Sequence, residues 1–164
     1  MTRVGYLLFE LLVVLVLIAI VALATMGTGS WQSHQLLRYE VDTLYYAIIA
    51  ASQRALCRGT LERLSFPTRT SWRSAATEHT LAESVTFGTI PQLKGPPSHP
   101  VTTVTDPISF VGHGIICYPN GQVQPGTVYF TDEQQHVYAI TCPVSSISYM
   151  RRYRYVDGRW ERLP

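Results

Sequence analysis

The sequence predicts an α+β protein: a long N-terminal helix, membrane-spanning in its first half and amphipathic in its second, packed on an antiparallel β-sheet head. Three observations predict this class. An apolar run of about twenty-one residues stands near the start of the 164-residue chain, an apolar stripe at helical spacing follows it, and short strand-like segments separated by turn residues fill the remainder. The predicted organisation is a leader at 1–5, a transmembrane helix at 6–26, its amphipathic continuation at 27–59 and a β-rich head at 60–164.

The apolar run at 6–26 reads YLLFELLVVLVLIAIVALATM and contains neither Pro nor Gly. A helix rises about 1.5 Å per residue, so a run of this length is expected to cross the hydrocarbon core of a bilayer. Arg3 precedes the run, and the positive-inside tendency places Met1 in the cytoplasm and the C-terminal part outside. The sequence therefore predicts a single-pass inner-membrane protein with its head outside the cytoplasm.

Glu10 is the only charged residue in this run. A carboxylate within a membrane helix is costly and is by default a functional residue that needs a partner. Cleavage between Gly5 and Tyr6 would create an α-ammonium at Tyr6. Pairing of that ammonium with Glu10 of a neighbouring subunit would remove the cost of two unpaired charges and fix the axial stagger of the helices, which is a hypothesis about assembly.

This arrangement resembles the type IV prepilin signal, in which a short basic leader ends in Gly and is followed by an aromatic residue or Met, a Glu at the fifth mature position and a long apolar helix. Gly5, Tyr6, Glu10 and the apolar residues 11–23 carry the match. The resemblance implies cleavage between Gly5 and Tyr6 by a prepilin peptidase, N-methylation of Tyr6 and assembly through Glu10.

Two other interpretations of the N-terminus remain open. One is an ordinary secretory signal peptide cleaved after Ala24, for which Ala22-Leu23-Ala24 is a small-x-small site. The apolar run is longer than a usual signal-peptide core and Glu10 interrupts its start, which argues against this interpretation. The other is a plain single-pass anchor in which Glu10 is incidental.

The second half of the predicted helix carries apolar residues at spacings of three and four, which predicts one buried stripe. Its members are Leu37, Val41, Leu44, Ile48, Ala51 and Ala55. The residues Gly-Thr-Gly-Ser at 27–30 predict a bend before this segment. The helix is expected to end near Arg58, because Gly59 suits the left-handed position that follows a helix.

The head is expected to contain six or seven short strands. The candidates are residues 60–66, 84–90, 108–111, 114–118, 127–131, 136–142 and 147–156. Asn120-Gly121 and Asp157-Gly158 are strong hairpin signals between such segments. Residues 67–80 are expected to be irregular and residues 91–100 to form a loop.

Short patterns in the head are similar to those of GspH/FimT-like minor pseudopilins. Ala51, Ala55, Arg58 and Gly59 match the helix-to-strand junction of that family, and residues 108–110 and 126–128 match its pattern before the last strands. The resemblance implies a minor subunit of a type II secretion pseudopilus or a type IV pilus. Its implied partners are other pilin or pseudopilin subunits, the prepilin peptidase, the inner-membrane assembly platform and membrane lipid.

Few residues suggest catalysis or metal binding. The five histidines are scattered without an HExxH or His-x-His pattern, and no GxSxG elbow or phosphate-binding loop occurs. The sequence therefore predicts no enzyme activity, metal or cofactor. Three cysteines occur without a CxxC pair, and Cys117 and Cys142 are the candidate disulfide if the head lies outside the cytoplasm, the alternative being three free thiols.

The C-terminus suggests a second function. Candidate DNA-binding arginines are interleaved with aromatic residues, a combination that suits phosphates and stacked bases; they are Arg151, Arg152, Arg154 and Arg159. On a strand, Arg152 and Arg154 would share one face and Tyr149, Tyr153 and Tyr155 the other. The alternative is an amphipathic final hairpin with inward tyrosines and solvated or paired arginines, and the net charge of +2 is too small to decide.

Overall fold

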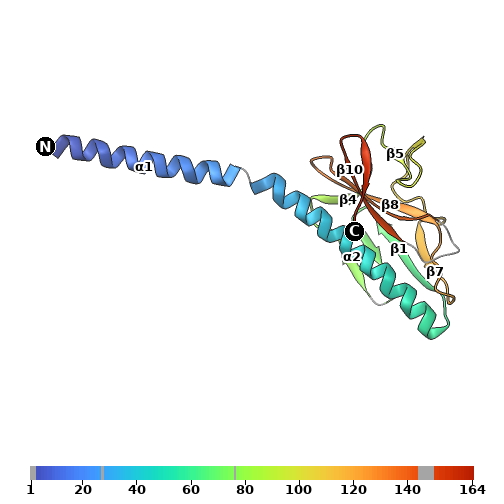
Figure 1. The fold of residues 1–164 in the computed structure, drawn as a ribbon. Coiled ribbons are helices and arrows are strands. Elements are labelled where there is room, and N and C mark those ends of the chain that lie inside the picture. Colours follow the sequence, from blue (N-terminus) through green and yellow to red (C-terminus); the bar gives the residue numbers. More distant parts are fainter. Residues whose placement is uncertain (1–2, 27, 76, 144–149) are drawn as a thin grey trace. The chain divides into compact units, whose positions relative to one another are not determined.

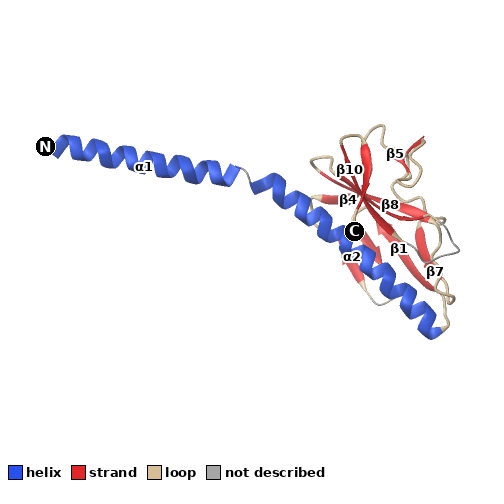
Figure 2. Ribbon diagram, in the orientation of Figure 1, coloured by secondary structure: helices blue, strands red, loops and turns tan. Residues whose placement is uncertain are grey.

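The computed structural model describes residues 3–26, 28–75, 77–143 and 150–164, with the side chains of 9–21, 33–75, 77–143 and 150–164. The chain divides into two compact units, Met1–Ser33 and His34–Pro164, each of which is considered by itself. Two helices come first, α1 (Arg3–Met26) and α2 (Thr28–Arg58), and every described strand follows them (Figures 1 and 2).

Helix α1 corrects one prediction. None of the helical segments in the described part of the chain reaches the length and hydropathy that a bilayer crossing requires. The prediction of a membrane-spanning first half of the helix is therefore wrong.

Helix α2 confirms the predicted stripe. Its six members, Leu37, Val41, Leu44, Ile48, Ala51 and Ala55, are each fully buried. The helix ends at Arg58, and Gly59 adopts φ of 66°, the left-handed conformation that glycine reaches without a steric penalty. The predicted bend at 27–30 falls at the boundary between α1 and α2, with Gly27 itself outside the described residues.

A four-stranded antiparallel sheet has the order β3-β2-β1-β7. It contains β1 (Glu62–Thr68) and β7 (Gly114–Cys117), close to two predicted strands, and adds β2 (Ser71–Arg73) and β3 (Glu78–Thr80). The prediction that residues 67–80 are irregular is therefore wrong. The polar sequence of this segment shows no strand pattern, but it forms a short hairpin. The large apolar side chain of that hairpin, Trp72, is only 2% exposed.

A five-stranded antiparallel sheet has the order β11-β10-β9-β8-β4. Its strands are β4 (Val85–Phe87), β8 (Gly126–Asp132), β9 (Val137–Cys142), β10 (Arg151–Val156) and β11 (Arg159–Arg162). Four of them match predicted strands, although residues 144–149 of the last predicted strand lie outside the described residues. Asp157 and Gly158 both have positive φ, 47° and 79°, and form the predicted hairpin between β10 and β11.

Two further predictions about the head are wrong. The segment 108–111 is not a strand, because only Ile108 makes a bridge, to Val128. The predicted loop at 91–100 contains β5 (Lys94–Gly95), which pairs with β6 (Thr102–Thr103). The β5–β6 pairing was missed because two residues in each strand are too few to produce an alternating pattern in the sequence.

The five-stranded sheet is buried on both faces. On one face Val128, Phe130 and Ile140 join the α2 stripe and the β1–β7 sheet in the main core. On the other face a smaller core forms from Leu93, Tyr129, Val137, Ala139 and Tyr153. Alternate residues of a strand point to opposite faces, so neighbours such as Tyr129 and Phe130 serve different cores. Every residue of β9 is buried for this reason.

Candidate functional site

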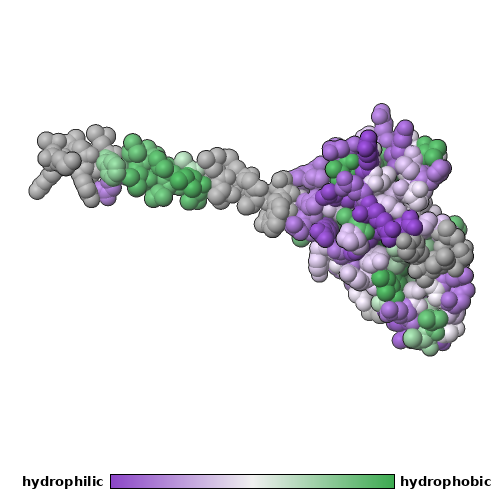
Figure 3. Space-filling view, viewed as in Figure 1, coloured by the Kyte–Doolittle hydropathy of each residue, from purple (hydrophilic) through white to green (hydrophobic). Residues whose placement is uncertain are grey.

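The most conspicuous exposed apolar surface is the segment of α1 from Phe9 to Val21. All the large apolar side chains from Phe9 to Val21 are exposed, with exposed fractions between 39% for Val13 and 65% for Phe9. They project in every direction around the helix and appear as continuous green in Figure 3. Folded proteins seldom leave a contiguous apolar surface of this kind uncovered unless it is an interaction site.

Glu10 is the one charged side chain among these described α1 residues, and it is exposed. Gly5 and Tyr6 lie in the helical backbone of α1, which begins at Arg3, so the helix runs across the predicted cleavage position. Glu10 stands five residues after Gly5, a little more than one helical turn. A cut after Gly5 would place the new N-terminus and this carboxylate near the same end of the helix.

The alternation predicted for the C-terminal strand is confirmed where it is described. Tyr153 lies in the smaller core, and Tyr155 packs against the same core. Arg152 and Arg154 project from the opposite face of β10. There Arg152 bonds to Asp42 of α2, and Arg154 lines a hollow together with His34 of α2. Tyr149 lies outside the described residues.

Arg152 is held by contacts within its own unit. Its Nη1 donates to Oδ1 of Asp42 on α2 over 2.5 Å, and its guanidinium lies 4.6 Å from the ring centre of Tyr45. Its Nη2 donates to the carbonyl oxygen of Pro164. The side chain is 17% exposed. Arg152 therefore fastens β10 and the C-terminus to α2.

The other three arginines differ in their surroundings. Arg154 Nη2 donates to Oε2 of Glu161 on β11 over 3.1 Å, a bond that raises the pKa of Arg154. Arg151 Nη1 donates to Oη of Tyr153 over 3.5 Å. Arg159 is exposed and makes no ion pair with any residue in the described part of the chain. The four predicted DNA-binding arginines thus do not form one open basic surface.

Cys117 and Cys142 are both buried, whereas Cys57 is exposed on α2. Cys117 is a free thiol whose Sγ lies 4.0 Å from the carbonyl oxygen of Ile48, so the candidate disulfide is not formed in this structure. Sγ of Cys142 lies 3.6 Å from the carbonyl oxygen of Val123. Burial raises the pKa of Cys117 to about 12, which keeps it protonated and unreactive at neutral pH.

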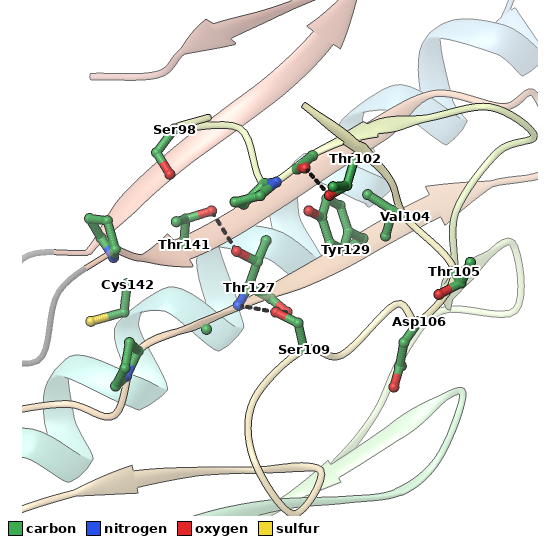
Figure 4. Close-up of a pocket in the computed structure, with 15 residues that line it drawn as sticks. Ser98, Thr102, Val104, Thr105, Asp106, Ser109, Thr127, Tyr129, Thr141 and Cys142 are labelled. Carbon is green, nitrogen blue, oxygen red and sulfur yellow. Dashed lines mark hydrogen bonds between the residues drawn. The ribbon is translucent and has the colours of Figure 1, made fainter. Parts of the chain in front are cut away.

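A hollow of about 390 Å³ lies beside β5 and β6, over the face of the five-stranded sheet that carries the smaller core (Figure 4). Hydroxyl groups dominate its lining, but they satisfy one another. Thr127 Oγ1 lies 3.1 Å from Thr141 Oγ1, Ser109 Oγ accepts from Thr127 N–H, and Thr102 Oγ1 donates to the Gly95 carbonyl. Asp106 supplies a carboxylate to the lining, and its Oδ1 accepts the N–H group of Ile108 over 2.9 Å.

A second hollow, of about 340 Å³, brings together residues that the sequence keeps far apart. His34 of α2 and His136 of the β8–β9 turn line it, with Arg154 and Asp157 of the C-terminal hairpin. The two imidazole rings stand edge to face, with ring centres 5.4 Å apart. No pattern in the sequence connects His34 with His136, because the packing of α2 against β9 brings them together.

Each of these imidazoles is anchored through one ring nitrogen. Nδ1 of His136 lies 2.7 Å from Oδ2 of Asp132, whose side chain is wholly buried and also accepts two backbone N–H groups. Nε2 of His34 lies 2.9 Å from Oη of Tyr138. The pKa of His34 is lowered, first by burial and then by the nearby His136 and Arg154. His34 is therefore neutral at neutral pH.

Within the described residues, no group of three or more His, Cys, Asp or Glu side chains is arranged to hold a metal ion. In comparisons with known proteins, no family model, no curated protein and no solved structure matches the chain. Its function must therefore be argued from its own residues.

Proposed function

We propose that the chain is a structural subunit of a pilus or pseudopilus, of the minor kind found in type II secretion pseudopili and type IV pili. A prepilin peptidase cleaves it between Gly5 and Tyr6, Tyr6 is N-methylated, and the head is displayed outside the cytoplasm. Its partners are other pilin or pseudopilin subunits and the inner-membrane assembly platform. The prepilin-like arrangement of Gly5, Tyr6 and Glu10 motivates the proposal.

The exposed apolar surface of α1 is the observation that carries this proposal. Thirteen consecutive positions from Phe9 to Val21 hold a single polar residue, Glu10, and the described side chains are all exposed. Burying one Leu, Ile or Phe side chain stabilises an assembly by about 1.5–3 kcal/mol. A bundle of α1 helices from several copies would cover the apolar side chains on all sides, which packing against one flat surface would not.

Glu10 has a defined role in such a bundle. An unpaired carboxylate among apolar helices is strongly unfavourable, and an opposite charge with hydrogen bonds offsets that cost. The α-ammonium of mature Tyr6 on a neighbouring copy is the natural partner. The pair forms only at one axial offset between helices, so Glu10 sets the register of the filament.

Assembly of Glu10 variants tests the proposal. The full chain and its Glu10→Gln variant are each produced with a prepilin peptidase and the partner subunits, and subunits in sheared filaments are quantified. We expect Glu10→Gln to reduce incorporation at least tenfold while the amount of folded protein stays constant. Glu83→Gln, at an exposed position of the head, is the matched control. Equal incorporation of all three proteins would contradict the proposed role.

The contacts of the C-terminal arginines do not add support to DNA binding. Arg152 and Arg154 are engaged with Asp42 and Glu161, and only Arg159 of the four projects freely in the described part of the chain. DNA uptake through these residues stays a prediction. The filament-subunit proposal does not depend on it.

A further inference from the structure

The hollow between α2, the β8–β9 turn and the β10–β11 hairpin is a candidate binding site that has no role in the proposed filament assembly. His34 and His136 are its central groups, and both belong to the unit His34–Pro164. We propose that these two imidazoles bind one divalent late transition metal ion, Cu²⁺ in preference to Zn²⁺, with water molecules completing the coordination.

The anchoring of His136 is the first argument. Metal-binding histidines usually direct one ring nitrogen to a carboxylate, which fixes the ring and makes the other nitrogen a stronger ligand. Asp132 holds Nδ1 of His136 at 2.7 Å and is itself fixed by the N–H groups of Gln134 and His136. The ring is 41% exposed, so Nε2 is left facing the hollow and the solvent.

His34 repeats this pattern with a phenol in place of a carboxylate. Its Nε2 is hydrogen-bonded to Tyr138, a side chain that is 1% exposed. When Nε2–H donates to the phenol oxygen, Nδ1 carries the free lone pair and becomes the ligand. Metal ions bind the neutral form of imidazole through such a lone pair.

The distance between the rings suits a shared metal. A coordinating nitrogen lies about 2 Å from the ion, so each ring centre lies about 3 Å from it, and two such rings side by side are about 5 Å apart. The observed separation is 5.4 Å with an angle of 79° between the ring planes.

The surrounding charges permit a cation. Arg154 lines the hollow and is paired with Glu161 at 3.1 Å. Asp132 holds Nδ1 of His136, and Asp157 is among the residues that line the hollow. Two nitrogens without a third protein ligand favour Cu²⁺, which heads the affinity order of the divalent first-row metals.

The test is a titration of the full chain with Cu²⁺, and then with Zn²⁺, followed by calorimetry. Electron paramagnetic resonance of the copper complex counts its nitrogen ligands. We expect one ion per chain, two imidazole nitrogens, and at least a tenfold loss of affinity in either His34→Ala or His136→Ala. Asp132→Asn, which keeps both ligands, should weaken binding about 10–100-fold. Binding should also weaken at pH 5.5, where protons compete for the imidazoles.

His99→Ala and His113→Ala, at exposed positions, are the matched controls and should bind as the parent chain does. Near-ultraviolet circular dichroism checks that each variant is folded, and His34→Gln and His136→Gln replace any alanine variant that is not. Absence of binding, a copper signal with one nitrogen, or affinity lost in the controls but kept in the His34 and His136 variants would overturn the proposal.

Discussion

Helices α1 and α2 are both long, with 24 and 31 residues, but they differ in how their apolar residues are distributed. In α2 the apolar residues recur every three or four positions, and one stripe is buried completely in its own unit. In α1 they occupy nearly every position, and the described ones are exposed. A helix with one apolar stripe can be satisfied by its own domain, whereas a helix that is apolar all round needs several partners.

The two faces of α2 provide the sharpest contrast. Cys57 is exposed at the end of α2, and Cys117 is buried against the carbonyl group of Ile48. With the pKa of Cys117 raised to about 12, its thiolate fraction at pH 8 is on the order of 10⁻⁴. We expect iodoacetamide to modify Cys57 at least about a thousandfold faster than Cys117 in the folded chain, as followed by peptide mass spectrometry. Similar rates would show that the α2 stripe is open to solvent.

Truncation of one apolar side chain in each helix measures the same contrast as stability. Ile48 is fully buried, so Ile48→Ala should lower the free energy of unfolding of the head by about 3 kcal/mol. Leu17 is 57% exposed on α1, and Leu17→Ala should leave that free energy within about 0.5 kcal/mol of the parent. Urea denaturation monitored by near-ultraviolet circular dichroism compares the two. Equal losses would remove the distinction between the helices.

The polar residues of α2 include a buried carboxylate, that of Glu40. Glu40 is 4% exposed; it lies 2.7 Å from Nε2 of His79 and accepts the N–H group of Ala82. Glu40→Gln should lower the free energy of unfolding by about 2 kcal/mol, because part of this buried network is left unsatisfied. Glu83→Gln, at an exposed position, should change it by less than about 0.5 kcal/mol in the same urea titration. An unchanged free energy of unfolding in Glu40→Gln would mean that the β2–β3 hairpin does not depend on α2.

The C-terminal arginines allow a comparison between a side chain held by contacts, Arg152, and an exposed one, Arg159. Arg152→Gln loses the contacts with Asp42 and Tyr45 and should destabilise the head by about 1 kcal/mol. Arg159→Gln, at an exposed position, should leave stability unchanged. Measuring DNA binding by the same two variants tests the DNA prediction separately. If DNA is bound through projecting charges, Arg159→Gln weakens binding more than Arg152→Gln does.

The pH dependence of stability is the smallest expected effect. The pKa of His34 is lower in the folded chain than its usual value of 6.5, so the unfolded chain binds more protons in this range. His34 therefore contributes stability that is present above pH 6.5 and is lost as the pH falls towards its folded pKa. His34→Gln should flatten the decline in melting temperature between pH 7 and pH 5. An unchanged slope would assign the decline to other groups.

The sequence predicted the elements whose patterns are long and regular. The six positions of the α2 stripe, the helix end at Gly59 and the Asp157-Gly158 hairpin follow from helical periodicity and from turn chemistry, and all three are confirmed. The short pairs β2–β3 and β5–β6 were missed, because two or three residues cannot display a period. A bilayer-crossing α1 was expected from hydropathy and is not supported by the described residues.

The candidate sites were predicted unevenly for a similar reason. Gly5, Tyr6 and Glu10 are close in sequence, so their spacing alone identified them. His34 and His136 lie far apart in the sequence, and no local pattern links them. Asp132 four residues before His136 was the one available local signal, since an Asp in a tight turn readily reaches a following His. Only the packing of α2 against the sheet shows that His34 is the residue that meets that turn.

The mature N-terminus, determined by mass spectrometry of the protein from cells that contain a prepilin peptidase, tests the proposed function most directly. We predict a chain that begins at Tyr6, N-methylated, with Gly5 removed. A chain that begins at Thr25 would identify a secreted protein with an ordinary signal peptide, and an intact Met1 would leave α1 without processing. Either of these two results would contradict the assignment of the chain as a filament subunit.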